Sequence, residues 1–480
     1  MSAAATKPKQ NYAAVAGATL ALVLLTALNF VNYIDRYILP GVQELVKKEF
    51  HVTDSAIGSI TFWFFLTYML SAPLTGWLGD RFPRKPLIVI CALLISAVNI
   101  LTGTVHEFDS LLFRHAILGI GEASLGIYAP ALLSDFYPED QRNRVLTIFY
   151  TAIPVGAAIG YLIGEMVGAK WGWRVPFYVS AVPGMAIGLL ILFLMKEPSR
   201  DANSNEPKEQ IFAPSRPLSG RSKLFYAALG FAFLIIAARV YFAWAHGRHP
   251  LTFGLLVLEI LIIASTIFLA RKDGIGEIVF SLATNPRYVY ATLGMAMVTF
   301  SLGGISAWMP SFLERSGFSA NSVGITLGAI TAGGGLGGTA VGGWLAQRWL
   351  RTNHRALYLV SAWSAALAVP PALLCFFGPR ATLLPALAVA MFLIFLGTGP
   401  LNAAIINAAP AAVRSTAIAI ELLLIHALGD TPSPKLIGIV SDHSNLATGL
   451  GITLVTMLIA AVLLFIGSRF AKPLSHDLAR

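Results

Sequence analysis

The stretch GWLGDRFPRKP, residues 76–86, joins two long apolar runs, 54–78 and 86–104. A similar stretch, GGWLAQRWLRTNHR at residues 342–355, also lies between two apolar runs. In both, Gly-Trp-Leu is followed by an arginine five residues after its glycine, and then by further basic residues. A basic turn that recurs between apolar runs predicts a chain built from two halves of related sequence.

The composition is that of a membrane protein. The 480 residues are 56% hydrophobic and only 12% charged, whereas a soluble chain carries roughly a quarter charged residues. Apolar runs of about 18 or more residues recur, each long enough to cross a hydrocarbon core about 30 Å thick. We therefore predict an all-α polytopic membrane protein with fourteen spanning segments. They are residues 12–39, 54–78, 86–104, 110–135, 144–168, 173–195, 224–245, 250–270, 287–312, 319–346, 355–377, 382–407, 413–440 and 446–469.

The distribution of basic residues predicts the topology. With the N-terminus inside, most of the 34 lysines and arginines fall on cytoplasmic loops and tails. This bias predicts that both termini are cytoplasmic, and we expect a bacterial inner membrane. The net charge of +10 then faces anionic lipid headgroups, so membrane lipids are expected partners and nucleic acid is not.

Several other classes of site are not expected. Cys91 and Cys375 lie far apart in apolar runs, which argues against a disulfide framework and a metal site. The glycine runs do not have the form of a phosphate-binding loop. We find no metal-ligand cluster or nucleophile elbow, so we predict no cofactor, no catalytic residue and no enzyme activity.

Polar stretches divide the chain. Residues 197–223 are rich in Pro, Ser and charge and predict a cytoplasmic linker. A second basic stretch sets the apolar pair 224–270 apart, and removing that pair leaves six spans on each side. The predicted parts are an N-terminal bundle 1–196, a linker 197–223, an inserted helix pair 224–270, a linker 271–286 and a C-terminal bundle 287–480.

Several motifs resemble a known family. GWLGDRFPRKP is similar to the loop 2–3 signature of the major facilitator superfamily. Four further stretches resemble its spinster branch: NYIDRYILPG (32–41), LGIGEASLGIYAPALLSDFYPEDQRNR (118–144), FYTAIPVGAAIGYLIG (149–164) and IHALGDTPSPKLIGIVSD (425–442). The resemblance implies two six-helix bundles around a central cavity that opens to one face at a time. It also implies a monomeric transporter of lysophospholipids or similar lipid-like anions. The extra pair 224–270 departs from the usual twelve-helix plan.

Four ionisable residues lie inside the first and fourth runs: Asp35, Arg36, Arg114 and Glu122. Such residues are rare in membranes and are functional by default. In the fold that the resemblance implies, the first and fourth helices both line the central cavity, so Asp35 and Arg114 lie at similar depth on facing helices and could pair; a purely structural pair is the alternative. Arg36 points about 100° away from Asp35, and we expect it to meet the anionic headgroup of a substrate or of ordinary lipid.

These residues suggest roles in coupling and binding. A carboxyl group removed from water takes up a proton more readily. The spinster resemblance also implies a functional carboxylate at Glu122. We predict Asp35 and Glu122 as proton-coupling residues, with protons as a second partner, and Arg36 and Arg114 as residues that bind the substrate headgroup.

The run 413–440 adds two candidate binding residues, His426 and Asp430, which are four apart and share a helical face. Pro432 and Pro434 predict a broken helix there, a common place for a substrate site. A proline kink with satisfied polar partners is the alternative.

The loop 76–86 supplies the expected gate. By resemblance, Asp80, Arg81 and Arg84 would meet the other half in one state and release it in the other. Ordinary positive-inside charge is the alternative, and it fits Arg84 well.

The function predicted from the sequence is proton-coupled transport of a lysophospholipid or similar lipid-like anion. Aromatic residues in the spans suit an apolar cavity for an amphiphile. An efflux carrier or exchanger of small organic anions or drugs is the alternative, and a non-transporting lipid scramblase or receptor is less favoured.

Overall fold

The computed structural model describes residues 15–198, except 138, and residues 274–472, except 410–413. Within these ranges the regular structure is helical. The predicted helix pair 224–270 lies outside the described residues, as does most of the predicted linker 197–223. Each of the other predicted spans coincides with described helices, and ten helices of the described part are long and apolar enough to cross a membrane.

The N-terminal bundle begins with a helix that continues well past residue 39, where its predicted span ends. Its elements are α1 (Ala18–Phe50), α2 (Asp54–Arg81), α3 (Arg84–Thr102), α4 (Phe108–Phe136), α5 (Glu139–Leu162), the π-helical turn η1 (Ile163–Val167), α6 (Gly168–Trp171) and α7 (Val175–Leu194). Helices are the natural result of this sequence, since lipid offers the backbone no hydrogen-bond partners.

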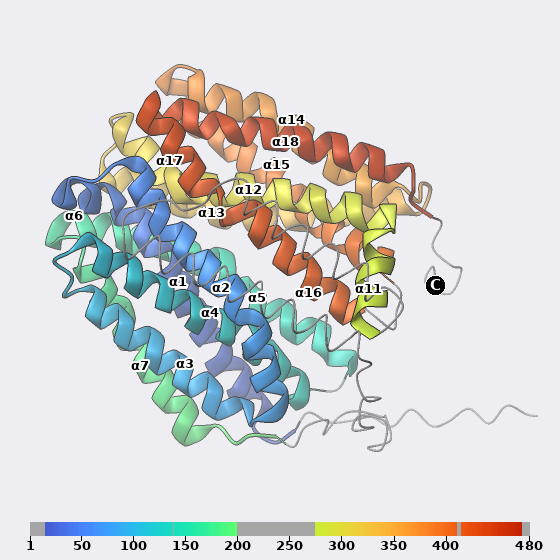
Figure 1. Cartoon of the computed structure of the whole chain (residues 1–480), viewed down its shortest axis with the longest axis horizontal. Coiled ribbons are helices and arrows are strands. Elements are labelled where there is room, and N and C mark those ends of the chain that lie inside the picture. Colours follow the sequence, from blue (N-terminus) through green and yellow to red (C-terminus); the bar gives the residue numbers. More distant parts are fainter. Residues whose placement is uncertain (1–14, 138, 199–273, 410–413, 473–480) are drawn as a thin grey trace, which may run out of the picture.

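The C-terminal bundle repeats this plan. Its elements are α11 (Gly274–Ala283), α12 (Pro286–Arg315), α13 (Ala320–Leu350), α14 (Ala356–Phe377), α15 (Arg380–Ala408), α16 (Arg414–Ile425), the π-helical turn η3 (His426–Asp430), α17 (Ser433–His443) and α18 (Leu446–Ser468). The stretch 271–286, predicted as a linker, thus contains the short helix α11, whose Leu282 is buried. Figure 1 shows the two bundles side by side.

Polar side chains fix where several helices begin. The side chains of Thr53 and Ser319 accept hydrogen bonds from backbone N–H groups in the first turns of α2 and α13. Asn285 and Asn445 do the same for α12 and α18. Such caps satisfy donors that a helix N-terminus otherwise leaves free, so each of these spans starts at a defined residue next to a short turn.

Gly160 of α5 and Gly164 of the following turn η1 bring this part of the chain directly against α1. A Cβ atom on Gly160 would lie 2.6 Å from the carbonyl oxygen of Ile34, and one on Gly164 would lie 2.7 Å from that of Ile38. No side chain fits in so small a space. Glycines at four-residue spacing thus allow the two helices to pack closely here.

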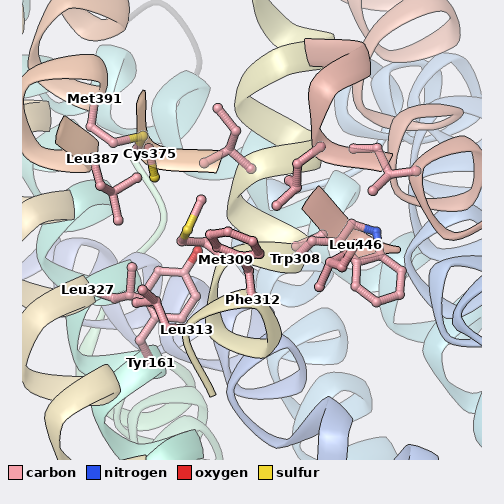
Figure 2. Packing of buried hydrophobic residues seen from close by; sticks show 14 of the residues in the cluster. Tyr161, Trp308, Met309, Phe312, Leu313, Leu327, Cys375, Leu387, Met391 and Leu446 are labelled. Carbon is pink, nitrogen blue, oxygen red and sulfur yellow. The ribbon is translucent and has the colours of Figure 1, made fainter. Parts of the chain in front are cut away.

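The hydrophobic cores show how the bundles are joined. One cluster contains residues of both bundles, among them Ile38, Tyr161, Trp308 and Leu313. In Figure 2, Tyr161 of the N-terminal bundle lies among Leu313, Leu327 and other apolar side chains of the C-terminal bundle. This shared cluster occupies the end of the molecule where α1 ends and α2 begins.

At the other end the cores are separate. A second cluster contains residues of the N-terminal bundle only, such as Leu25, Ile88 and Leu132. A third contains residues of the C-terminal bundle only, such as Tyr288 and Leu401. We call the end with residues 50–54 and the shared cluster the closed end, and the opposite end, with residues 81–84, the open end.

Candidate functional site

A cavity of about 850 Å³ lies between the bundles. The N-terminal bundle contributes residues of α1, α2, α4 and α5 to its wall, and the C-terminal bundle contributes residues of α12, α13, α15 and η3. Much of the wall is apolar or aromatic, with Phe64, Phe65, Tyr150 and Phe395 among its residues. A mostly apolar cavity with a few polar groups is the usual form of a small-molecule site.

Arg36 and Glu122 form an ion pair at this wall. The Nη2 and Nε atoms of Arg36 lie 2.7 and 2.8 Å from Oε2 of Glu122. The side chain of Glu122 is only 1% exposed and that of Arg36 is 16% exposed. Within the described chain, Oε1 of Glu122 has no hydrogen-bond partner. Arg36 is therefore the group that compensates the burial of this carboxylate.

Aromatic rings surround the guanidinium of Arg36. Its Cζ atom lies 4.9 Å from the ring centre of Tyr33, 5.3 Å from Phe64, 5.8 Å from Phe65 and 5.2 Å from Tyr68. These distances are within the range of cation–π attraction. The rings stabilise the cation without neutralising it, so Arg36 can still attract an anion that enters the cavity.

The expected pairing of Asp35 with Arg114 is wrong. Arg114 donates hydrogen bonds to the carbonyl oxygen of Leu101 and to the Thr104 hydroxyl, at the end of α3. Free carbonyls at a helix C-terminus attract basic side chains, which draws Arg114 to α3 and away from α1. Arg114 is not among the described residues that line the cavity. Asp35 does line it and is buried, and within the described chain its Oδ1 has no hydrogen-bond partner.

Asp430 of η3 lines the opposite wall of the cavity, and His426 of the same turn contacts it. The Nδ1 atom of His426 lies 2.8 and 3.0 Å from the two carboxylate oxygens of Asp430. The imidazole ring also stacks against Phe65 at 5.8 Å and meets Tyr68 edge-on at 5.2 Å. Phe65 and Tyr68 thus contact Arg36 of their own bundle and His426 of the other.

The predicted break in this segment is confirmed. Helix α16 ends at Ile425, the π-helical turn η3 follows, and α17 starts at Ser433 after Pro432. Proline has no backbone N–H, and π-helical turns are frequent at functional sites. The break places Asp430 close to α12, since a Cβ atom on Gly303 would lie 2.5 Å from the Asp430 Cβ.

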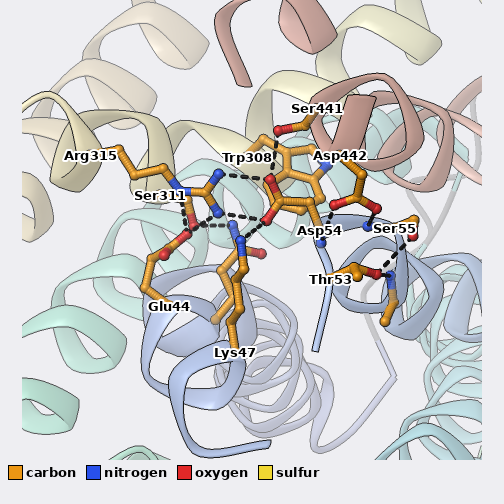
Figure 3. A network of polar contacts seen from close by, with 12 residues as sticks. Glu44, Lys47, Thr53, Asp54, Ser55, Trp308, Ser311, Arg315, Ser441 and Asp442 are labelled. Atoms are coloured by element: carbon orange, nitrogen blue, oxygen red, sulfur yellow. Dashed lines mark hydrogen bonds and ion pairs between the residues drawn. The ribbon is translucent and has the colours of Figure 1, made fainter. Parts of the chain in front are cut away.

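A polar network joins the bundles at the closed end. Arg315 of α12 donates to both carboxylate oxygens of Asp54 at 2.7 Å and to Glu44 at 2.6 and 2.9 Å. The Lys47 ammonium donates to Asp54 at 2.5 Å, and the Ser441 hydroxyl donates to it at 2.6 Å. Figure 3 shows Asp54 at the centre of these contacts. Residues of α1, α2, α12 and α17 are thereby held together.

Asp442 adds a second link, because it caps a helix of the other bundle. Its carboxylate accepts hydrogen bonds from the backbone N–H groups of Asp54 at 2.7 Å and Ser55 at 2.9 Å (Figure 3). These are the first residues of α2. A carboxylate at a helix N-terminus is stabilised by the free donors and by the helix dipole, so this second cap of α2, beside that of Thr53, forms only while α17 stays against it.

Of the three predicted gating residues, only Arg84 has a described side chain, and it contacts its own bundle. Arg84 donates to Asp135 of α4, and Glu197 accepts hydrogen bonds from the backbone N–H groups of Arg84 and Lys85. The side chains of Asp80 and Arg81 lie outside what the structure describes. A gating role for these residues stays a prediction.

The fold and the cavity can be compared with known proteins. The family model of the Major Facilitator Superfamily matches residues 25–429. A bacterial homologue of the human lysosomal transporter spinster, in an inward-facing and unoccupied conformation, has the same fold. The TM-score is 0.74 at 19% identity, over 95% of this chain and 98% of that one. The chain is therefore a multi-pass transporter of the major facilitator superfamily, not an enzyme.

Curated relatives identify the branch. Mouse protein spinster homolog 1 is 31% identical over 453 residues, which cover 88% of this chain and 73% of the relative. The zebrafish sphingosine-1-phosphate transporter SPNS2 is 28% identical over 440 residues, which cover 87% of this chain and 75% of the relative. The chain belongs to the spinster family, as the sequence motifs predict.

Proposed function

We propose that this protein is a proton-coupled secondary transporter that moves a lysophospholipid or similar lipid-like anion by alternating access. The observation that carries the proposal is a caged arginine, Arg36, in a largely apolar cavity of about 850 Å³. An amphiphile with one anionic headgroup and one long chain matches such a wall. The name of the relative SPNS2, a sphingosine-1-phosphate transporter, supports the same substrate class.

The ion pair of Arg36 and Glu122 couples substrate to protons in this proposal. A phosphate headgroup and the carboxylate of Glu122 compete for the same guanidinium. Protonation of Glu122 weakens its hold on Arg36 and frees the cation for the headgroup. The buried Asp35 serves as a second proton-coupling carboxylate, and His426 and Asp430 contact the headgroup from the opposite wall.

The conformation corresponds to one of the two states of an alternating-access cycle, open at one end and closed at the other. The bundles share a core at the closed end and have separate cores at the open end. The excess of basic residues in the loops at the open end supports a cytoplasmic position for that end, so we assign an inward-facing state in the inner membrane. In the outward-facing state, Asp80 and Arg81 would join the bundles at the cytoplasmic end. A proton or substrate shifts this equilibrium only if it binds one state more tightly.

Uptake into proteoliposomes tests the proposal. Purified protein is assayed for uptake of a labelled lysophospholipid, with and without an imposed pH gradient. We expect uptake that depends on the gradient in the parent protein. Glu122→Gln should bind the lipid and fail to respond to the gradient. Glu49→Gln is a matched control, because Glu49 pairs with Arg174 inside the N-terminal bundle.

Each result has a clear consequence. Normal gradient-driven uptake by Glu122→Gln would remove the proton role of this residue. No lysophospholipid uptake under either condition would favour the second candidate, an efflux carrier or exchanger of small organic anions or drugs. Threonine hydroxyl groups in the cavity wall support that candidate, because an acyl chain cannot form hydrogen bonds with them. They belong to Thr299, Thr331, Thr339 and Thr398.

A further inference from the structure

Glu165, which has no role in the proposal above, is a second buried carboxylate in the N-terminal bundle. It lies on the π-helical turn η1 and is only 1% exposed. Within the described part of the chain, neither of its carboxylate oxygens has a hydrogen-bond partner. An ionised carboxylate in such a place loses its hydration and gains nothing in return. In the described part of the chain, no hydrogen bond therefore compensates the burial of an ionised Glu165.

The nearest charged groups are mostly other carboxylates. The carboxyl group of Glu165 interacts with that of Glu314 on α12, across the interface between the bundles. Glu44 on α1 adds a second negative charge that acts on both residues. Arg315 also acts on Glu314, but its hydrogen bonds go to Glu44 and Asp54. Within the described residues, no cation forms an ion pair with Glu165.

The other neighbours of Glu165 offer it no charge. Tyr161, one turn earlier, donates its hydroxyl hydrogen to the carbonyl oxygen of Ser306 at 2.7 Å. The helices packed on both sides present glycines. A Cβ atom on Gly41 of α1 would lie 3.1 Å from the Glu165 nitrogen, and one on Gly324 of α13 would lie 3.1 Å from the Glu165 Cβ. The carboxyl group is thus enclosed between the bundles beside Glu314.

We propose that Glu165 and Glu314 bind one proton between them, and that this shared proton holds the closed end shut. Two ionised carboxylates at such a site repel each other, whereas a carboxylic acid and a carboxylate form a charge-assisted hydrogen bond. The bond joins η1 of one bundle to α12 of the other, so it forms only when the bundles meet here. The site is a proton-binding site separate from Glu122, and it rests on the proposed alternating access.

The sign of the pH effect follows from this geometry. When the bundles part at this end, the two carboxyl groups separate and become hydrated. Each then has the pKa of an ordinary hydrated glutamate and is ionised at neutral pH. The closed conformation therefore binds one proton more than the open one. Its population falls as pH rises, and the ratio of closed to open molecules changes by up to about tenfold per pH unit. On our assignment of this end to the outside, external acid favours the inward-facing state.

A distance measurement across the closed end tests the proposal. Spin labels are placed at Lys48→Cys and Asn321→Cys, which are exposed positions on opposite bundles. The two buried native cysteines, Cys91 and Cys375, are replaced by alanine. The distance distribution of the full chain in lipid nanodiscs is then followed from acid to alkaline pH. The parent should lose its short-distance population as pH rises.

Neutral variants sharpen the test. Glutamine mimics the protonated acid, so Glu165→Gln should keep the short distance at alkaline pH and lower the pH slope by about one proton. Glu314→Gln should do the same, and it carries the test if Glu165→Gln does not fold. Glu49→Gln, a carboxylate at the same end that pairs within its bundle, should titrate like the parent.

Two results would overturn the inference: a parent whose distance does not respond to pH, or glutamine variants that both titrate like the parent. Because no substrate is used, the outcome is separable from that of the proposed function. Suppose that lysophospholipid uptake is driven by the gradient, but that the spin-label distances of both glutamine variants depend on pH as in the parent. The proposed function would then stand, and the proton site at Glu165 would be rejected. If Glu165→Gln abolishes the pH dependence of the distance and the parent takes up no lysophospholipid, the proton site would stand and the proposed function would be rejected.

Discussion

Glu122 and Glu165 are equally buried and lie in the same bundle, yet their surroundings are opposite. Each is 1% exposed. Glu122 has Arg36 at 2.7 Å, inside a cage of aromatic rings. Glu165 faces a second carboxylate, Glu314, on the other bundle. Burial alone therefore does not define what a membrane carboxylate does, and its partner decides which ligand can change its state.

The difference separates two kinds of control. An anion can compete with Glu122 for Arg36, so that site responds to substrate as well as to protons. Among the described residues, Glu165 has no paired cation for an anion to capture, so in our proposal its site responds to protons alone. The first pair lies within one bundle, whereas the second spans the interface. Binding and conformational control can thus be tested by different substitutions.

Arg36→Ala should have the largest effect, because it leaves Glu122 buried without its cation and removes the charge that attracts the substrate. We expect lysophospholipid binding to weaken by more than about a hundredfold, roughly 3 kcal/mol or more. Equilibrium binding of the labelled lipid to purified protein measures this. Arg174→Ala, which breaks a partly exposed ion pair in the same bundle, should change the free energy of lipid binding by less than about 1 kcal/mol.

A double substitution separates binding from folding. Arg36→Ala with Glu122→Ala removes the unpaired carboxylate, so thermal stability should recover while binding stays weak. Parent-like binding by Arg36→Ala would mean that the headgroup does not bind this arginine. The Arg36–Glu122 pair would then not respond to substrate, and it would no longer differ from Glu165 in this respect.

Arg315→Ala should have the next largest effect, on conformation and not on binding. It removes the hydrogen bonds from α12 to Asp54 and Glu44. Hydrogen bonds to charged groups contribute about 1.5–3 kcal/mol each, so the open population at the closed end should rise at least about tenfold. The spin-label pair measures the change, and Arg174→Ala should leave the distances unaltered. Unchanged distances in Arg315→Ala would show that the apolar cluster alone holds this end.

Much of the fold could be predicted from the sequence, because each span is decided locally. Lipid forces an apolar run of sufficient length into a helix. Pro432 and Pro434 predict the break at η3 from covalent structure alone. The glycine spacing on α5 likewise predicts its contact with a neighbouring helix.

The partners of the charged residues could not be predicted in the same way. Helix geometry gives the angle between Asp35 and Arg36, but it does not say which neighbouring helix each one meets. The sequence therefore led to a pair of Asp35 with Arg114, where packing pairs Arg36 with Glu122. Asp54 and Arg315 look like ordinary flanking charges until the bundles are brought together. Glu165 differs, since it lies inside the apolar run 144–168 and meets the criterion that selected Glu122.

His426→Phe should have a moderate effect on transport. Phenylalanine keeps a ring beside Phe65 and Tyr68 but loses the contact of His426 with Asp430. The buried Asp430 is then left without this partner, at a cost of about 1–2 kcal/mol, or roughly a tenfold lower initial rate of lysophospholipid uptake. His443→Phe, at an exposed histidine on the same segment, should behave like the parent. An unchanged uptake rate in His426→Phe would show that His426 contributes to packing and not to transport.

Arg114→Ala should have the smallest effect, although its sequence position resembles that of Arg36. Both are arginines within apolar runs, but Arg114 donates to Leu101 and Thr104 at the end of α3. Its loss should cost about 1 kcal/mol of stability or less and change lysophospholipid binding less than about twofold. Measuring it beside Arg36→Ala compares two cations that differ chiefly in whether they face the cavity. A tenfold loss of binding in Arg114→Ala would place the headgroup near α3, and would bring back the pairing with Asp35 as a feature of the other conformation.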